Sequence, residues 1–219
     1  MVDRLSPELL VRAYSRGLFP MAEGQDDPNL YWVDPEERGL LPLDAFHVPR
    51  RLARVVRSDA FDLRINTNFA AVIQACAETV KTGDRSSTWI NDEIVRAYNE
   101  LHQIGIAHSV ECWQNGYLVG GLYGLSLGAG FFGESMFSRT ENASKVALVH
   151  LAARLRLGGY TLLDCQFWND HLAQFGLQAI DRDIFREQLE QALDQEGDFG
   201  GPSTIRDGAH AIAVLKGEG

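Results

Sequence analysis

Long apolar runs are missing from this sequence of 219 residues. No run approaches the roughly 18 residues that a membrane-spanning helix needs. Residues 1–7 also lack the apolar core of a secretory signal peptide. We therefore expect a cytoplasmic protein with no membrane partner. Its hydrophobic content of 45% is nevertheless ordinary for a globular protein, so we expect a sizeable folded core.

Cysteine is scarce as well. Cys76, Cys112 and Cys165 are odd in number and unclustered, and each stands in an apolar run. This pattern predicts reduced core cysteines and excludes a disulfide framework or a zinc site. Four histidines likewise show no metal-ligand spacing, and we expect core or surface roles for His102, His108, His150 and His171. The sequence therefore predicts no metal and no cofactor.

Positive charge is in the minority, with 20 Lys and Arg against 30 Asp and Glu, giving a net charge of −10. This excess argues against indiscriminate binding of nucleic acid. Arg50, Arg51, Arg54 and Arg57 form a local exception, because no acidic residue stands between them. A helix would gather Arg50, Arg54 and Arg57 on one face. Such charge runs are usually solvated, but this face would also suit phosphate groups.

The hydrophobic pattern predicts an α+β fold in which helices flank a mixed β-sheet. Ser6-Pro7 begins a helix that Gly17 ends, residues 20–45 form loop with short extended pieces, and a small N-terminal unit ends near Asp34-Pro35. Asn115-Gly116 predicts a β-hairpin. The other expected helices are 47–57, 68–80, 91–103, 142–157, 171–175 and 183–193. The expected strands are 61–65, 107–113, 117–123, 129–137 and 160–165, with a last edge strand after Gly200.

Two catalytic motifs can be weighed by their context. Gly124-Leu-Ser126-Leu-Gly128 fits the nucleophile-elbow pattern, but that elbow requires a helix directly after it and the sequence here continues as a strand. A glycine-rich turn is the better interpretation. An acetyl-CoA site at the helix near Asn142 would need a glycine cluster close to the pyrophosphate, and none is present.

Two acidic positions remain as candidates. Glu134 stands among apolar residues in the segment 131–138, which is either the polar face of a strand or an apolar pocket with one acidic recognition group. Asp164 and Gln166 end the strand 160–165 and would share one face of it, with Cys165 pointing away. A carboxylate and an amide could hold a nucleophilic amine, or they could be a capping Asp and a surface Gln.

At these residues the chain resembles the leucyl/phenylalanyl-tRNA–protein transferase family. The matching segments follow the family's order over about residues 5–190, and they are Gly17-Leu-Phe-Pro20, Thr88-Trp-Ile90, 105–113, 118–124, 132–138, Asn142-Ala-Ser-Lys145 and Leu163-Asp-Cys-Gln166 with Asn169-Asp-His171. The resemblance implies a small N-terminal domain, residues 1–35, and a GNAT-like aminoacyl-transfer domain, residues 36–219. It also implies transfer of leucine or phenylalanine, with methionine expected as well, from aminoacyl-tRNA to proteins with N-terminal Arg or Lys. Such proteins would be marked for degradation by the N-degron pathway.

The resemblance also implies residue roles. Gln166 would orient the attacking amine, and Asp164 would support proton transfer electrostatically without a covalent enzyme intermediate. Arg50, Arg54 and Arg57 would hold the tRNA acceptor stem through its phosphates. The remaining residues would contact the aminoacyl group or the acceptor protein, and they are Trp89, Leu122, Phe131, Glu134, Ser135, Met136 and Asn169.

The chain departs from the family at two places. Met21 stands where well-known members carry Trp, and the segment beyond about residue 195 matches nothing in the family pattern. An alternative of another class is a non-catalytic module that binds basic N-termini through Glu134 and its apolar neighbours. The basic helix at Arg50 distinguishes the two, because a peptide-binding module needs no face for phosphates.

Overall fold

A seven-stranded mixed sheet forms the centre of the computed structural model, which describes residues 5–78, 88–201 and 205–218. All neighbouring strands are antiparallel except β7 and β8, which are parallel. In spatial order the strands are β4 (Asp62–Ile65), β5 (Ala107–Gln114), β6 (Tyr117–Leu127), β7 (Gly130–Ser138), β8 (Leu162–Asp164), β3 (Glu37–Leu40) and β9 (Gln178–Asp181).

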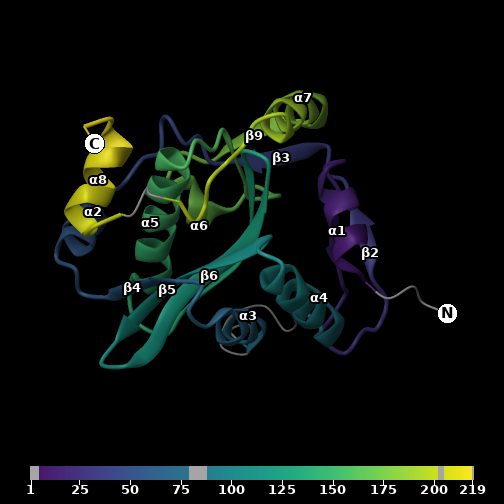
Figure 1. Ribbon diagram of the computed structural model, residues 1–219, viewed down its shortest axis with the longest axis horizontal. Coiled ribbons are helices and arrows are strands. Elements are labelled where there is room, and N and C mark those ends of the chain that lie inside the picture. The colour runs from purple at the N-terminus through teal and green to yellow at the C-terminus, as the bar shows by residue number, and fades with distance from the viewer. Residues whose placement is uncertain (1–4, 79–87, 202–204, 219) are drawn as a thin grey trace.

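Helices cover both faces of the sheet, so the core is divided into two apolar clusters (Figure 1). One face carries α5 (Ala143–Leu157) with α2 (Arg50–Arg57), α8 (Gly208–Lys216) and the short α6 (Asp170–Ala173). The other carries α3 (Phe69–Glu78), α4 (Asp92–Gln103), α1 (Pro7–Tyr14) and α7 (Arg182–Leu193). A small separate sheet pairs β1 (Phe19–Met21) with β2 (Tyr31–Val33).

Most local predictions are confirmed, because each has a specific start or stop signal. Ser6 and Asn91 accept hydrogen bonds from Leu9 N–H and Ile94 N–H and so cap α1 and α4. Asn115 and Gly116 take positive φ values of 52° and 80° in the turn of the β5–β6 hairpin. The predicted basic helix is α2. The expected end of the helix 68–80 lies outside the described residues.

The sequence did not indicate two strands of the central sheet, and one prediction about the fold was wrong. Residues 37–40, expected within a loop with short extended pieces, form the strand β3 between β8 and β9, and β9 itself was not expected. The expected edge strand after Gly200 is instead the helix α8. Asp207 caps this helix by accepting from His210 N–H, and Ile212 and Leu215 pack into the core beside α5.

Candidate active site

A cavity of about 470 Å³ opens between β7, α5 and the segment that joins β8 to α6. One part of its lining is apolar, from β6, β7, α5, β8 and α6: Leu122, Met136, Leu148, Leu151, Leu163 and Leu172. Polar side chains from β7, the β8–α6 segment and α6 line another part: Glu134, Ser135, Gln166, Asn169 and His171. An apolar cavity with a few convergent polar groups is typical of a ligand-binding site.

A smaller cavity of about 210 Å³ adjoins the first. Phe19 and Met21 of the N-terminal unit line it together with Phe167 and Trp168. Five residues line both cavities, and they are Trp89, Glu134, Cys165, Gln166 and Asn169. Two molecules bound in the two cavities would therefore meet at Glu134 and Gln166.

Glu134 reaches this position through an irregularity in β7. The register of β6 and β7 shifts between Tyr123 and Gly124, which leaves Glu134 as an extra residue between Gly133 and Ser135. The Glu134 carboxyl then accepts hydrogen bonds from the hydroxyls of Tyr14, at 2.7 Å, and Tyr98, at 3.1 Å. Burial raises the pKa of Glu134 to about 8, although these two hydrogen bonds lower it. Glu134 therefore favours the protonated carboxyl at neutral pH.

Three tyrosines surround this carboxyl. The hydroxyls of Tyr14 and Tyr98 also hydrogen-bond to one another, which joins α1 to α4. Tyr123 is fully buried and lines the larger cavity, yet its hydroxyl has no hydrogen-bond partner in the part of the chain that the structure describes. An orphaned buried hydroxyl is costly, so a hydrogen-bond partner for this group would be stabilising.

Asp164 does not face the cavity; it forms a buried ion pair with Arg38 of β3. The Arg38 Nε donates to Asp164 Oδ1 at 2.9 Å, and Nη2 donates to Oδ2 at 2.6 Å. The third guanidinium nitrogen, Nη1, donates to the Gly17 carbonyl at 2.8 Å, and the guanidinium lies between the rings of Phe19 and Phe185. Arg38 therefore holds the end of β8 against the N-terminal unit.

The same strand, β3, fixes the loop that carries Gln166. Gly39 N–H donates to the Gln166 carbonyl at 3.1 Å, and Cys165 N–H donates to the Gly39 carbonyl at 2.8 Å. A Cβ atom on Gly39 would lie 2.5 Å from the Phe167 carbonyl oxygen, so only glycine permits this close approach.

Gln166 itself adopts a left-handed conformation with a φ of 61°. Its backbone N–H donates to Asp164 Oδ1 at 2.9 Å. Its side-chain Nε2 is buried and has no hydrogen-bond partner among the described residues, while the residue lines both cavities. A rare backbone conformation that is held from several sides is typical of functional sites.

Most of the residues singled out in the sequence meet at these cavities, and they are Trp89, Leu122, Glu134, Ser135, Met136, Gln166 and Asn169. Phe131 differs: it is fully buried in the core, stacks on Phe199, and is absent from the lining of both cavities. The expected common face of Asp164 and Gln166 was also wrong. The strand ends at Asp164, so Cys165 and Gln166 both line the cavities.

Sequence reasoning missed Arg38, Tyr14, Tyr98 and Tyr123. Arg38 lies in a segment whose prolines and acidic residues predict a loop, and its partner Asp164 is distant in sequence. Tyr14 was assigned to the apolar stripe of α1, and it is indeed fully buried. Its position at the carboxyl of Glu134 depends on the packing of α1 against α4, for which the sequence carries no signal.

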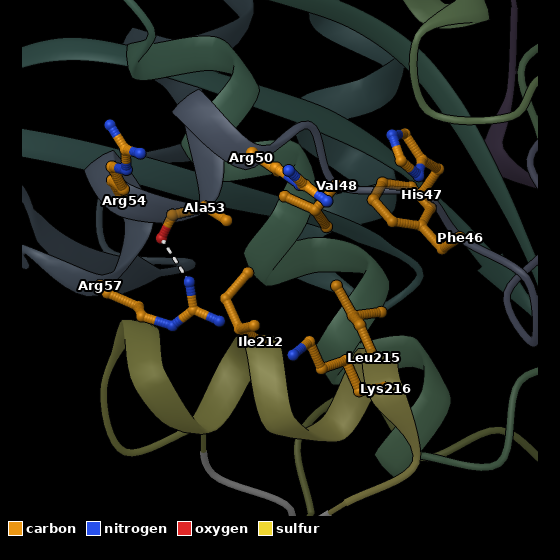
Figure 2. A pocket seen from close by; sticks show the side chains of 10 residues that line it. All are labelled: Phe46, His47, Val48, Arg50, Ala53, Arg54, Arg57, Ile212, Leu215 and Lys216. Atoms are coloured by element: carbon orange, nitrogen blue, oxygen red, sulfur yellow. Dashed lines mark hydrogen bonds between the residues drawn. The ribbon is translucent and has the colours of Figure 1, made fainter.

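The arginines of α2 line a separate cavity of about 500 Å³ between α2 and α8 (Figure 2). Arg50, Arg54 and Arg57 are all exposed there, as the predicted helical face requires. His47 and Lys216 also line it. The predicted basic face therefore exists, and it has a second wall that the sequence did not indicate.

Other candidate chemistries find no support among the described residues. Ser126 lies within β6 and its hydroxyl pairs with that of Tyr160 at 2.5 Å, so no nucleophile elbow forms. No group of three or more His, Cys, Asp or Glu side chains in the described ranges is placed to hold a metal ion. None of the helices described here is long and apolar enough to cross a membrane.

The solved structures first define the class of fold. FemX superimposes with a TM-score of 0.53 at 12% sequence identity, over 77% of this chain and 65% of the FemX chain. This likeness shows an α+β fold of the FemX type, and the expected GNAT-like assignment is not confirmed.

Sequence relatives then give the family. A family model described as leucyl/phenylalanyl-tRNA protein transferase matches residues 40–190. A second model, described as the N-terminal domain of leucyl/phenylalanyl-tRNA protein transferase, matches residues 3–36. A leucyl/phenylalanyl-tRNA–protein transferase of Paramagnetospirillum magneticum is 57% identical over 92% of this chain and 95% of its own length. One from Caulobacter vibrioides is 53% identical over 99% of this chain and 97% of its own. The chain belongs to the leucyl/phenylalanyl-tRNA–protein transferase family, whose members are enzymes that transfer an aminoacyl group from tRNA to proteins.

Proposed function

We propose that the larger cavity binds the leucyl or phenylalanyl group of an aminoacyl-tRNA and that the smaller one binds the N-terminal residue of the acceptor protein. The observation that carries this proposal is the side chain of Gln166. Its Nε2 is buried and unpartnered within the described residues, and it stands where the two cavities meet. Donor ester and acceptor amine would both come within reach of this amide.

The donor side is selected by apolar contact. The branched side chain of Leu122 and the flexible side chain of Met136 contact a substrate without needing a hydrogen bond from it. Ser135 lines the same cavity. An apolar pocket separates side chains of similar size by only about 1–3 kcal/mol, so leucine, phenylalanine and methionine should all be used. Phe131 supports this wall from the core, where its ring packs closely over Gly124.

The acceptor side is selected by charge. Glu134 lies at the boundary of the smaller cavity, and a lysine or arginine side chain of the acceptor would favour its ionised form. Trp89 could stack on that cation, and Asn169 offers an amide beside it. Residues 1–35 act in this proposal as the unit that supplies Phe19 and Met21 to the acceptor cavity.

The chemistry needs positioning more than a strong base. An α-amino group has a pKa of about 7.7–8.0, so part of it is neutral at pH 7. Its nitrogen attacks the ester carbonyl, the new C–N bond forms, and the C–O bond to the tRNA ribose breaks. The proton lost by the amine goes to the departing ribose oxygen. Gln166 holds the amine and the carbonyl in register, which can supply a large part of the acceleration.

Asp164 acts indirectly in this scheme. Its negative charge supports the developing ammonium electrostatically, and its Oδ1 holds the backbone of Gln166. Arg38 occupies both carboxylate oxygens, which suits a positioning role better than the role of a free base. Transfer therefore proceeds without a covalent enzyme intermediate.

The arginines of α2 hold the tRNA acceptor stem through its phosphates, because Arg50, Arg54 and Arg57 offer charge without base-specific geometry. The products would be proteins marked for degradation by the N-degron pathway in the cytoplasm, where aminoacyl-tRNA is available.

The test mixes the purified protein with labelled Leu-tRNA and a peptide that begins with Arg. The control peptide is identical except for an N-terminal Glu. We expect label on the first peptide and little on the second, and Glu134→Gln should reduce the difference between them. If the peptide binds but no label is transferred, the protein is a peptide-binding module and the proposal is wrong.

A further inference from the structure

The C-terminal helix α8 lies beyond residues 40–190, the range of the family match, and yet it forms one wall of the basic cavity (Figure 2). We infer that α8, through Lys216, completes a binding site for the ribose–phosphate backbone of the tRNA acceptor stem. This inference rests on the proposed function, since it adds a second wall to the tRNA contact of α2.

The charges around the cavity are uncompensated. Arg50, Arg54 and Lys216 are exposed, and no acidic side chain among the described residues pairs with them. Arg57 makes one long hydrogen bond, from Nη1 to the Ala53 carbonyl at 3.4 Å. In a chain with a net charge of −10, such a group of free cations is unusual. Its electrostatic potential would attract a polyanion to this surface.

The start of α2 adds backbone donors to the same wall. Pro49 occupies the N-cap position and gives no side-chain hydrogen bond, and the first turn contains no acidic residue. The first N–H groups of a helix carry partial positive charge and bind anions when no cap occupies them. Val48 and Arg50, on either side of Pro49, both line the cavity.

The floor of the cavity is apolar, which distinguishes it from a site for a small free anion. Phe46, Ala53, Ile212 and Leu215 line it beneath the cations. Its volume of about 500 Å³ lies within the range of about 300–1,000 Å³ that holds small organic ligands. A nucleotide could set its phosphate against the rim and its ribose against this floor.

A single helix, α5, separates the basic cavity from the proposed aminoacyl site. Helix α5 stands between them: Ser144, Leu148 and Leu151 line the aminoacyl cavity, while α2 and α8 pack on α5 on the other side (Figure 1). Packed helices lie about 8–10 Å apart, so one nucleic acid strand could reach both sites. His47 N–H donates to the Phe175 carbonyl at 3.0 Å, which ties the rim to the segment after α6.

Lys216→Gln tests the inference, because this exposed side chain can be replaced without disturbing the core. Arg51→Gln is the matched control: it removes one charge from an exposed position of α2 that does not line the cavity. We expect Lys216→Gln to weaken binding of a tRNA transcript about 3–10-fold and to reduce the salt-dependence slope by about 1, with Arg51→Gln unchanged. Lys216→Arg should restore both the affinity for tRNA and the salt-dependence slope. At saturating Leu-tRNA, the kcat of transfer by Lys216→Gln should equal that of the parent protein.

An RNA minihelix that carries only the acceptor stem locates the contact. Lys216→Gln should weaken binding of this minihelix by the same factor as binding of the whole tRNA. If the minihelix binds equally well to the parent protein and to Lys216→Gln, Lys216 does not contact the acceptor stem. If Lys216→Gln behaves like Arg51→Gln while Arg54→Gln weakens tRNA binding, this inference is wrong and the proposed tRNA face stands. If Arg54→Gln also leaves tRNA binding unchanged, the proposed contact between α2 and tRNA is wrong as well.

Discussion

Arg38 and Asp164 form a two-point ion pair in which both side chains are almost fully buried, at 1% and 0% exposure. The pair joins β3, which lies between β8 and the edge strand β9, to the end of β8, directly beside Gln166. Because Asp164 also accepts from the backbone N–H of Gln166, the ion pair helps to hold the backbone from which the Gln166 side chain extends.

Replacing Arg38 by Leu should therefore remove both stability and activity. The buried Asp164 carboxylate would lose its only cationic partner in the described structure, and breaking one side of such a pair costs about 3–5 kcal/mol. The double variant Arg38→Leu/Asp164→Leu should recover part of that stability, since no buried charge remains. It should still transfer poorly, because Gln166 N–H has lost its acceptor. Urea unfolding and transfer rates measure the two effects, and full activity in the double variant would contradict the positioning role.

Gly39→Ala should shift the loop 165–167. The new Cβ atom would lie 2.5 Å from the Phe167 carbonyl, so the loop must move outward. We expect the rate of transfer to fall at least ~10-fold while tRNA affinity is kept, because the loop 165–167 does not line the basic cavity. Gly24→Ala is the control, since open space surrounds Gly24. Equal rates for both variants would show that the loop is not held at this point.

Tyr123→Phe should separate stability from binding. The buried hydroxyl of Tyr123 lacks a partner in the described chain, so its removal should leave the free energy of unfolding unchanged or raise it by about 1 kcal/mol. If the hydroxyl bonds a substrate in the larger cavity, the KM for Leu-tRNA or for the acceptor peptide should rise several-fold. A clear loss of stability without any change in KM would contradict both expectations.

Glu134 should make stability depend on pH. Its pKa is raised from 4.5 to about 8 in the folded protein, so the folded state holds a proton that the unfolded chain has released. This contribution is complete below about pH 4.5, is lost progressively as the pH rises from 4.5, and is gone above about 8. From pH 7 to about 8, unfolding free energies should therefore fall more steeply for the parent protein than for Glu134→Gln, and above about pH 8 the two slopes should become equal.

The buried histidines do not contribute to the change in stability above pH 7. Burial lowers the pKa of His108 and His150 to about 4, so their effect on stability lies between about pH 4 and 6.5. Tyr14, Tyr98 and Tyr123, which surround Glu134, have pKa values raised well above 10 and do not titrate there. If the unfolding free energies of the parent protein and of Glu134→Gln depend on pH in the same way, Glu134 is already ionised at neutral pH.

Local signals were enough to predict much of this fold. Asn91 and the Asn115-Gly116 pair determine a helix start and a hairpin turn within a few residues, and both were predicted correctly. The strand β3 could not be predicted in this way. It has four residues, one of them glycine, and its pairing partners β8 and β9 are far away in sequence.

The candidate site shows the same division. Gln166, Glu134 and Asn169 could be named from the sequence because family motifs surround them, and the structure brings them together. The side chains that position them could not, because they come from other elements: Arg38 from β3, and Tyr14 from α1. The register shift in β7 that turns Glu134 toward Tyr14 is a property of strand pairing, and single-sequence alternation does not reveal it.

The most direct test of the account is the single-turnover rate of leucine transfer by Gln166→Ala, with Gln191→Ala on the exposed face of α7 as the control. Removing one positioned hydrogen-bonding group from a reaction centre typically costs about 100–1,000-fold in rate. We predict a loss of this size for Gln166→Ala, with tRNA and peptide affinities unchanged and the control fully active. Transfer by Gln166→Ala at the parent rate would contradict the claim that the two substrates meet at Gln166.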